Sequence, residues 1–306
     1  MPTPQPGVLS AGGAQAYFLT FTVADGAERT ALNKAIGDLL PSAGALAEQA
    51  KRARLLCTLG IGSEFWDRLS PARRPAGLRP FRAVKANGRV APATGGDLFL
   101  QITSGCHDLN LDLAMGLVRG LQPLATMAEE THGFRYRDSR DLTGFIDGTE
   151  NPKGKARALA ALIGEEDRPF AGGSYVAVQR YVHDLERWRR LDDREQEQII
   201  GRTKRGSVEL PKAKKPQTAH ISHVVIEQDG AELQILRQIY PWGTVREAGL
   251  YFAAYTKSLD VFDLMLARMM GATGDGLHDR LMEFSRAVTG ATFFVPSLET
   301  LSSLKQ

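Results

Sequence analysis

The chain lacks most of the features that mark secreted, membrane and nucleic-acid-binding proteins. It has only two cysteines, Cys57 and Cys106, and they form no CxxC pair, so a disulfide framework is not expected and a reducing compartment fits. No stretch approaches the roughly 20 apolar residues that span a bilayer, and the first residues show no basic, apolar or twin-arginine export signal. The formal net charge of +3 is too small to indicate a nucleic-acid partner. We therefore expect a cytoplasmic protein with neither a nucleic-acid nor a membrane partner.

Motifs for nucleotides and phosphoryl transfer are also missing. The run LGIGSEF at 59–65 begins like a dinucleotide fingerprint, but Phe65 stands where its third glycine is needed, and no phosphate-binding GxxxxGK loop occurs. The string IDGT is similar to the DxDGT loop of hydrolases that use an aspartyl nucleophile. Phe145 replaces the first aspartate of that loop, which excludes this chemistry.

What the chain does have is the composition of an ordinary globular protein, with 43% hydrophobic and 24% charged residues among 306. Alternating and helical apolar patterns predict strands at 16–23, 54–61, 97–103, 174–182, 233–240 and 250–256, and helices at 27–40, 63–69, from 107, 184–200 and 259–270. Residues 70–96 are expected to form a loop and 123–172 a connection. The similar strand-then-helix blocks at 96–121 and 248–270 indicate two α+β halves, each an antiparallel sheet backed by helices.

The segment GFIDGTENP at 144–152 is the first candidate for chemistry. Gly144 and Gly148 flank Asp147 closely, so the backbone can approach a ligand and hold the carboxylate at a defined angle. An ordinary turn with an aspartate cap explains the same residues equally well.

Arg237 is the second candidate. In the predicted strand, alternation places Leu233, Ile235, Arg237 and Ile239 on one face. An arginine on an apolar face is unfavourable unless it is paired or faces a polar ligand. The alternatives are an electrostatic role in a site and a buried salt bridge.

The remaining candidates are His220 and an apolar pair. An iron-ligating histidine needs its second ring nitrogen bonded to a carboxylate or carbonyl, and Asp279 is our candidate for that group. Leu250 and Phe252 share a strand face and could form the wall of a cofactor pocket. A core histidine with satisfied hydrogen bonds, and plain core packing, are the alternatives.

Together these blocks match one family. The order GFIDGTENP, GGSYVAVQRYVHDLERW (172–188), IIGRTK (199–204), the Ala219-His220 segment, ILRQIYPWG (235–243) and the tail GLYFAAYTKS resembles the dye-decolourising peroxidases from about residue 16 onward. The resemblance is to the compact bacterial class without export signals. It implies an α+β fold of two ferredoxin-like halves, residues 1–135 and 136–306, in a dimeric α/β barrel arrangement. It also implies one haem b per chain, bound in the second half.

By position in the family motifs, His220 would be the proximal iron ligand, Asp147 the distal acid/base and Arg237 the distal arginine. The resemblance places further residues near the haem edge or propionates: Phe145, Ile146, Gly148, Thr149, Gln179 and Arg202. Leu250 and Phe252, which share a strand face, would form an apolar wall of the haem pocket. Two positions depart from the family pattern. His223 stands where an arginine is common, which puts a propionate contact in doubt, and Ile239 stands where asparagine or serine is common, which removes a polar group from the peroxide side.

The resemblance implies a peroxidase that reduces hydrogen peroxide while it oxidises dyes, phenols or similar small aromatic reductants. A homo-oligomer, dimeric or higher, is also expected. Trp66, Trp188 and Trp242 are candidates for an electron relay to the surface, with packing as the alternative for each. The competing function is a haem-binding or haem-iron-releasing protein that uses the same pocket.

Overall fold

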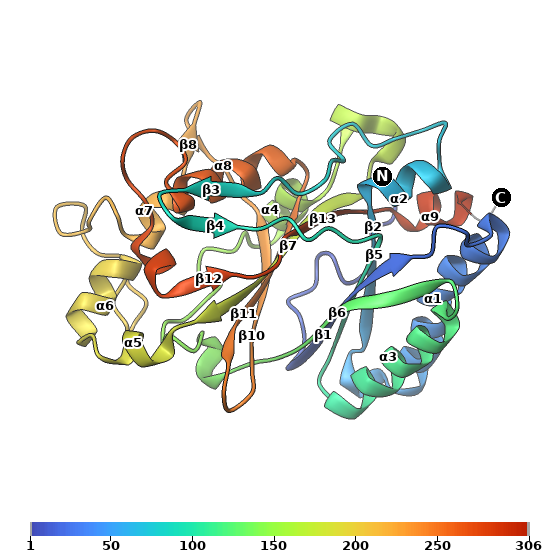
Figure 1. Cartoon of the computed structure of the whole chain (residues 1–306), viewed down its shortest axis with the longest axis horizontal. Helices are drawn as coiled ribbons and strands as arrows, with labels where there is room; N and C mark the ends of the chain where they lie inside the picture. Colours follow the sequence, from blue (N-terminus) through green and yellow to red (C-terminus); the bar gives the residue numbers. More distant parts are fainter. Residues whose placement is uncertain (1, 305–306) are drawn as a thin grey trace.

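The computed structural model describes residues 2–304. Figure 1 shows strands in the middle of the molecule, with α1 (Arg29–Gln49) and α3 (His107–Leu121) at one end and α5 (Leu185–Arg189), α6 (Asp193–Ile200) and α7 (His220–Val224) at the other. The other elements of the first half are β1 (Gln15–Val23), β2 (Leu56–Gly62), α2 (Ser63–Leu69), β3 (Val84–Ala86), β4 (Arg89–Ala91), β5 (Leu98–Ser104) and β6 (Ala125–Phe134). Those of the second half are α4 (Lys155–Ala161), β7 (Ser174–His183), β8 (Glu227–Gln228), β9 (Ala231–Glu232), β10 (Leu236–Gly243), β11 (Ala248–Thr256), α8 (Leu259–Met270), β12 (Ser285–Ala287), β13 (Ala291–Val295) and α9 (Leu298–Ser303). Short 3₁₀ turns are η1 (Lys51–Ala53), η2 (Arg137–Ser139), η3 (Glu165–Phe170) and η4 (Arg280–Glu283).

The two halves repeat one strand order. It is β6-β1-β5-β2 in the first half and β10-β11-β7-β13 in the second, antiparallel throughout, as in a ferredoxin-like fold. The predicted α+β class with ferredoxin-like halves is therefore confirmed. Between the halves, β10 pairs with β6 at Trp242 and Gly133, and β13 pairs with β2 at two positions. Because β11 also pairs with β7, the pairings follow a closed circuit through both halves.

In the first half, the space between sheet and helices is filled with apolar side chains. The cluster joins side chains of the strands, α1 and α3, among them Tyr17, Leu19, Phe21, Leu32, Ile36, Leu39, Leu100, Ile102, Leu113 and Leu117. Period-two spacing on β1 and helical spacing on α1 bring these residues to one interface. Full burial of such a side chain contributes about 1.5–3 kcal/mol, so this core is a major source of stability.

Several element boundaries differ from the sequence predictions. Helix α1 was expected to end at residue 40 but continues through Pro41 to Gln49, because residues beyond the proline, such as Ala43, pack against the core. The single helix predicted at 184–200 is wrong: it is two helices, α5 and α6, since the Asp192 side chain caps α6 in a capping box with Glu195.

Two strand predictions also need correction. β6 lies inside the segment predicted as a connection. The prediction missed this strand because its sequence is largely polar; its pairing with β1 stabilises it as a strand. β10 begins at Leu236 rather than at residue 233, and the predicted loop at 70–96 contains the β3–β4 hairpin.

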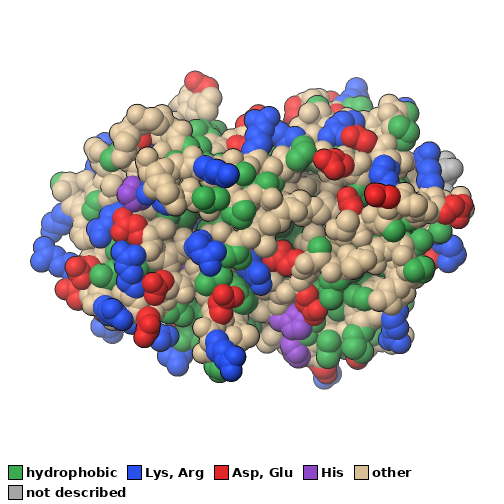
Figure 2. All heavy atoms as spheres, viewed as in Figure 1, with side chains coloured by type: hydrophobic (Ala, Val, Ile, Leu, Met, Phe, Trp, Pro, Cys, Tyr) green, Lys and Arg blue, Asp and Glu red, His purple; other side chains and the backbone are tan. Residues whose placement is uncertain are grey.

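The face of the molecule seen in Figure 2 carries charges of both signs. Figure 2 shows basic and acidic side chains interspersed over the viewed face, as the small net charge predicts. Among residues 2–304, no helix is both long and apolar enough to cross a membrane.

Candidate functional site

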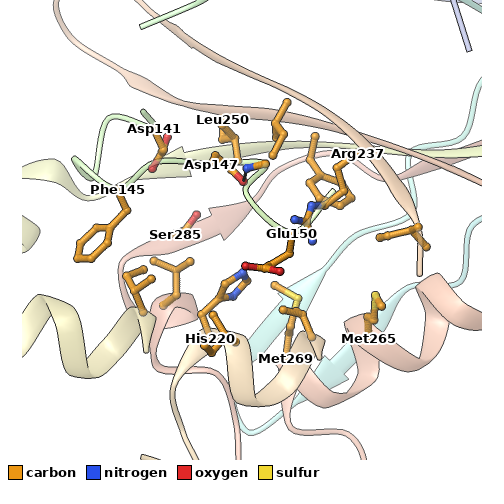
Figure 3. A pocket seen from close by; sticks show the side chains of 18 of the residues that line it. Asp141, Phe145, Asp147, Glu150, His220, Arg237, Leu250, Met265, Met269 and Ser285 are labelled. Atoms are coloured by element: carbon orange, nitrogen blue, oxygen red, sulfur yellow. Dashed lines mark hydrogen bonds between the residues drawn. The ribbon is translucent and has the colours of Figure 1, made fainter. Parts of the chain in front are cut away.

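A large cavity occupies the second half, between strands β7, β10 and β11 and helices α7 and α8 (Figure 3). It contains about 1380 Å³ of empty space, part of it open to solvent. All residues predicted for the site line this cavity: Phe145, Ile146, Asp147, Gly148, Thr149, Gln179, Arg202, His220, Arg237, Leu250 and Phe252. The fold therefore brings together side chains that are up to about a hundred positions apart in the sequence.

His220 is the first residue of α7 and is held from behind by a buried carboxylate. Its Nδ1 lies 2.6 Å from Oδ2 of Asp279, which is fully buried and accepts a second bond from the Leu281 N–H through Oδ1. Burial lowers the pKa of His220, but the charge and hydrogen bond of Asp279 outweigh it, so the net pKa shift is upward. With Nδ1 engaged, Nε2 is the ring nitrogen available to a ligand in the cavity. This is the arrangement of a metal-ligating histidine oriented by a carboxylate.

Asp147 lies on a loop whose backbone defines its position. The Asp147 N–H donates to the Ser139 carbonyl at 3.1 Å, and the Gly148 N–H donates to Asp147 Oδ1 at 2.6 Å. Gly148 has φ +75°, a conformation that favours glycine and allows this close contact. Burial raises the pKa of Asp147, the nearby Arg237 charge opposes it, and the Asp141 charge adds to it, so the net pKa shift is upward.

Arg140 fixes the same loop, and sequence reasoning missed it. Its guanidinium donates to the Gly144 and Lys204 carbonyls, both at 2.7 Å, and to the Arg205 carbonyl at 3.1 Å. The loop before Asp147 is thereby tied to the segment after α6. An arginine seven residues before Asp147 carries no signal of this role in one sequence.

Arg237 approaches the cavity from β10, on the same side as Asp147, whereas His220 lies across from both (Figure 3). Within residues 2–304, its buried Nε has no hydrogen-bond partner. Asn151 connects the Asp147 loop to this strand: its Nδ2 donates to the Arg237 carbonyl at 2.8 Å, and the Arg237 N–H donates to its Oδ1 at 2.9 Å. Two hydrogen bonds therefore join the loop to the strand.

A buried polar group lies beside the loop, and the sequence did not reveal it. The His183 ring lies between Ser285 Oγ, 2.8 Å from Nδ1, and Asp141 Oδ1, 3.3 Å from Nε2. Asp141 also accepts two bonds from Thr143, and all four side chains line the cavity. Burial raises the pKa of Asp141, but the His183 charge and these hydrogen bonds lower it to about 2. The partners are 42 and 102 residues apart in sequence, so no local pattern could connect them.

The remaining walls combine an apolar surface with a polar edge. Met265 and Met269 of α8 lie across the cavity from Leu250 of β11 (Figure 3), and Phe252 and Phe262 add apolar surface to the lining. At the edge, Arg202 Nη1 donates to Glu150 at 2.7 Å, and its Nε donates to the Ser207 carbonyl.

The positions that depart from the family pattern have different outcomes. Ile239 lines the cavity, but His223 does not, and Arg268 donates to the His223 carbonyl from outside it.

The three tryptophans are buried, and each indole N–H donates to a backbone carbonyl: Trp66 to Arg73, Trp188 to Thr143 and Trp242 to Tyr181. None of them lies at the surface, so the packing interpretation fits all three.

The cavity fits a flat, largely apolar group that carries one metal atom. The Nε2 of His220 is directed away from Asp279, and the buried nitrogens Arg237 Nε and Gln179 Nε2 have no partner among the described residues. Buried polar atoms are almost always bonded in proteins, so these two indicate a missing ligand. A haem satisfies all of these features.

Comparison with known proteins points the same way. Two family models match the chain: "Dyp-type peroxidase, N-terminal" over residues 5–135 and "Dyp-type peroxidase, C-terminal" over residues 138–300. The dye-decolorizing peroxidase of Mycolicibacterium paratuberculosis is 41% identical over 301 residues, which cover 97% of this chain and 84% of that protein. A deferrochelatase of Escherichia coli is 26% identical over 174 residues, which cover 51% of this chain and 41% of that protein.

Solved structures are similar over nearly the whole chain. DyPB from Rhodococcus jostii has a TM-score of 0.94 at 40% identity and covers 98% of both chains. A variant of that protein in complex with heme has a TM-score of 0.95 at 41% identity, again with 98% coverage of both chains. The encapsulated DyP-type peroxidase from Mycobacterium smegmatis has the same score, identity and coverage.

Proposed function

Because the chain belongs to the Dyp-type peroxidase family, it is a haem peroxidase, and we propose that Asp147, Arg237 and His220 carry its chemistry. The substrates are a peroxide and a reductant. When bound, the haem supplies the electrons that reduce the peroxide and regains them from the reductant. The observation that carries the residue assignment is the opposition of two sets of groups across one cavity: Asp147 with Arg237 on one side, and His220 with Asp279 on the other.

His220 is the residue that holds the iron. Its Nε2 faces the cavity, and the bond from Nδ1 to Asp279 fixes the ring orientation and makes the free nitrogen more basic. Gln179, Thr149 and Arg202 are polar groups available to the carboxylates of the haem, while Leu250 and Phe252 would form an apolar wall beside it.

Asp147 moves the proton. As a base it takes the proton from one peroxide oxygen, and as an acid it delivers that proton to the other oxygen, which leaves as water. The upward shift of its pKa brings the carboxyl closer to the balance that such a dual role requires. Arg237 cannot be neutralised at physiological pH, so it stabilises the negative charge that develops on the leaving oxygen.

The test is Asp147→Asn. We expect full haem content but a rate of reaction with hydrogen peroxide that is lower by about 10²–10⁴-fold, because general acid–base catalysis typically contributes that much. Stopped-flow absorbance of the haem measures this rate. Asp138→Asn removes an exposed carboxylate of the same segment and serves as control. An unchanged rate in Asp147→Asn would exclude the assignment.

A haem-binding or iron-releasing protein is the alternative that the sequence leaves open. Its support is the distant similarity to deferrochelatases over half of the chain, against similarity to peroxidases over nearly all of it. Peroxide-dependent oxidation of a dye, measured beside release of iron from intact porphyrin, discriminates between them.

We also propose that residues 1–135 and 136–306 are the two domains, that the chain forms a homo-oligomer in the cytoplasm, and that its reductants are small aromatic molecules such as dyes and phenols. The family resemblance supports each of these. Light scattering of the haem-loaded protein tests the oligomer, since a monomer has a mass of 33.4 kDa.

A further inference from the structure

A second cavity opens from the surface onto Asp147. It contains about 960 Å³ of empty space, and it shares six lining residues with the haem cavity: Asp141, Asp147, Gly148, Arg237, Ile239 and Leu250. It therefore reaches the side on which Asp147 and Arg237 would act on the peroxide. We call this second cavity the vestibule.

The vestibule is lined by an excess of positive charge. Arg135, Arg140, Lys153, Arg157 and Arg237 all contribute to its wall. Arg140 and Arg157 donate to backbone carbonyls, which do not neutralise them. In the part of the chain that the structure describes, none of the five forms a salt bridge with a carboxylate. A cleft lined by one sign of charge concentrates ligands of the opposite sign.

Carboxylates are few on the same wall. The lining contains only Asp141, which is paired with His183, and Asp147, whose pKa is shifted upward by burial. The other cavity differs, because Glu150 and Glu232 lie on its lining. The excess of positive charge thus distinguishes the vestibule from the haem cavity.

The vestibule also offers apolar and aromatic surface. Tyr136, Tyr240, Pro241, Ile239 and Leu250 line it. Tyr240 is fixed there, because its hydroxyl accepts from the Gly13 N–H at 3.0 Å. Hydrogen peroxide is small and neutral and gains nothing from either the cations or the apolar wall.

We propose that the vestibule admits organic hydroperoxides that carry a carboxylate, which would be the preferred oxidant class of this chain. The cations attract the carboxylate, the apolar wall accommodates the hydrocarbon, and the hydroperoxide end reaches Asp147. This inference rests on the proposed function, since the same Asp147 serves both. The occupant is assigned as the oxidant because the vestibule ends at the groups that cleave the peroxide bond, whereas a reductant only has to deliver electrons.

The proposed reaction balances in atoms and electrons with the reductant that a peroxidase uses. The O–O bond of ROOH breaks, Asp147 transfers the hydroperoxide proton to the RO oxygen, and the alcohol ROH leaves. Two reductant molecules each give one electron and one proton, which reduce the second oxygen to water. The sum is ROOH + 2 AH → ROH + H₂O + 2 A•.

The experiment compares cumene hydroperoxide with its para-carboxylated derivative on the haem-loaded protein. Stopped-flow absorbance gives the second-order rate constant for each. At low ionic strength we expect the carboxylated compound to react about tenfold faster, at the lower end of electrostatic enhancements. In about 1 M salt, where the screening length is about 3 Å, the ratio should approach one.

The variant that tests the wall is Arg135→Gln/Lys153→Gln, since both side chains are exposed at the opening and line the vestibule. We expect the ratio of the two rate constants to fall well below the wild-type value, although the other three cations remain. The control, Lys155→Gln/Arg205→Gln, removes the same charge from exposed neighbours that do not line the vestibule, and should keep the wild-type ratio.

Binding gives a readout that does not depend on turnover. Calorimetry with para-isopropylbenzoate should show binding that weakens in Arg135→Gln/Lys153→Gln, and para-isopropylbenzamide should bind weakly to both proteins. Two outcomes would overturn the inference and leave the proposed function intact. One is a ratio of rate constants at or below one in the wild type. The other is a ratio, or an affinity for para-isopropylbenzoate, that is unchanged in Arg135→Gln/Lys153→Gln. If the protein reacts with no peroxide, hydrogen peroxide included, the proposed function and the vestibule proposal are both wrong. This outcome differs from one in which only the preference for the carboxylated hydroperoxide is missing.

Discussion

The two halves of the chain share a strand order but differ in what lies between the sheet and its helices. In the first half, α1 and α3 cover the sheet with tightly packed apolar side chains. In the second half, the corresponding space between β7, β10, β11 and α8 is the large cavity. The same architecture therefore serves one half as a source of stability and the other as a binding site.

The difference can be followed along one strand of each half. β1 directs Tyr17, Leu19 and Phe21 into a closed core. The β10 segment directs Arg237 and Ile239 into the cavity instead. A guanidinium at this position is tolerated because the space beside it is open to a ligand.

The largest expected effect is the loss of haem when a histidine of the second half, but not of the first, is replaced. His220→Ala should remove nearly all haem from the protein, because the only proposed iron ligand is lost. Haem per chain, measured by absorbance of the denatured complex against protein concentration, gives the result. His132→Ala, an exposed histidine of the first half, is the control and should bind haem fully. Stoichiometric haem in His220→Ala would show that another residue holds the iron.

The second prediction concerns the buried pair in the wall of the cavity. Asp141→Asn removes the buried carboxylate that bonds to His183 and accepts two hydrogen bonds from Thr143, so the free energy of unfolding at neutral pH should fall by about 3 kcal/mol. The pKa of Asp141 is held at about 2 in the folded chain, below its ordinary value of about 3.9. Its stabilisation is therefore complete above the ordinary pKa and is lost as the pH falls toward about 2.

Urea unfolding of wild type and Asp141→Asn over a series of pH values measures this effect. Asp138→Asn, whose carboxylate is exposed, should follow the wild type throughout. A difference between wild type and Asp141→Asn that stays constant into the acid range would contradict the assigned pKa.

The third prediction compares the two interiors directly. Leu100→Ala in the closed core should lower the free energy of unfolding by about 3 kcal/mol. Leu250→Ala, on the wall of the cavity, should lower it by about 1 kcal/mol, because that side chain already borders open space. Urea unfolding of both variants prepared without haem gives the two values. Equal losses would indicate that the second half is packed as tightly as the first.

The smallest expected effect is the pH dependence of the reaction with peroxide. Asp147 must be ionised to act as a base, so the rate should rise with pH through its upward-shifted pKa, by at most about tenfold per pH unit. The folded chain holds the Asp147 proton more tightly than the unfolded chain. Its contribution to stability is therefore present in acid and is lost as the pH rises, opposite in sign to that of Asp141.

Stopped-flow rates from acid to neutral pH check this profile, and Asp147→Asn should flatten it. A profile that is the same in the variant would assign the titration to a different group.

Part of the site could be predicted from local patterns, whereas Thr149, Gln179 and Arg202 were placed only by the family resemblance. The face of β10 follows from period-two alternation, and the glycines around Asp147 mark a strained loop within a few residues. Asp279 was reached by a chemical requirement: a histidine ligand needs a partner for its second nitrogen. In each case the sequence contains the pattern that the fold uses.

What could not be predicted depends on contacts between distant segments. His183 closes a strand like many other polar residues, and only the fold brings Asp141 and Ser285 to it. β6 is stabilised by its pairing with β1 rather than by its own composition. The cations of the vestibule come from separate stretches of the chain, so their common field appears only in three dimensions.

The closed circuit of strand pairings has a consequence for how copies of the chain can associate. Sheet edges with unpaired N–H and C=O groups are the usual sites at which one protein adds a strand to another. Each of the long strands β7, β11, β10, β6, β1, β5, β2 and β13 has a neighbour on both sides. Strand addition by another copy is therefore limited to the short strands and to the junctions β10–β6 and β13–β2, where only one and two residue pairs join the halves.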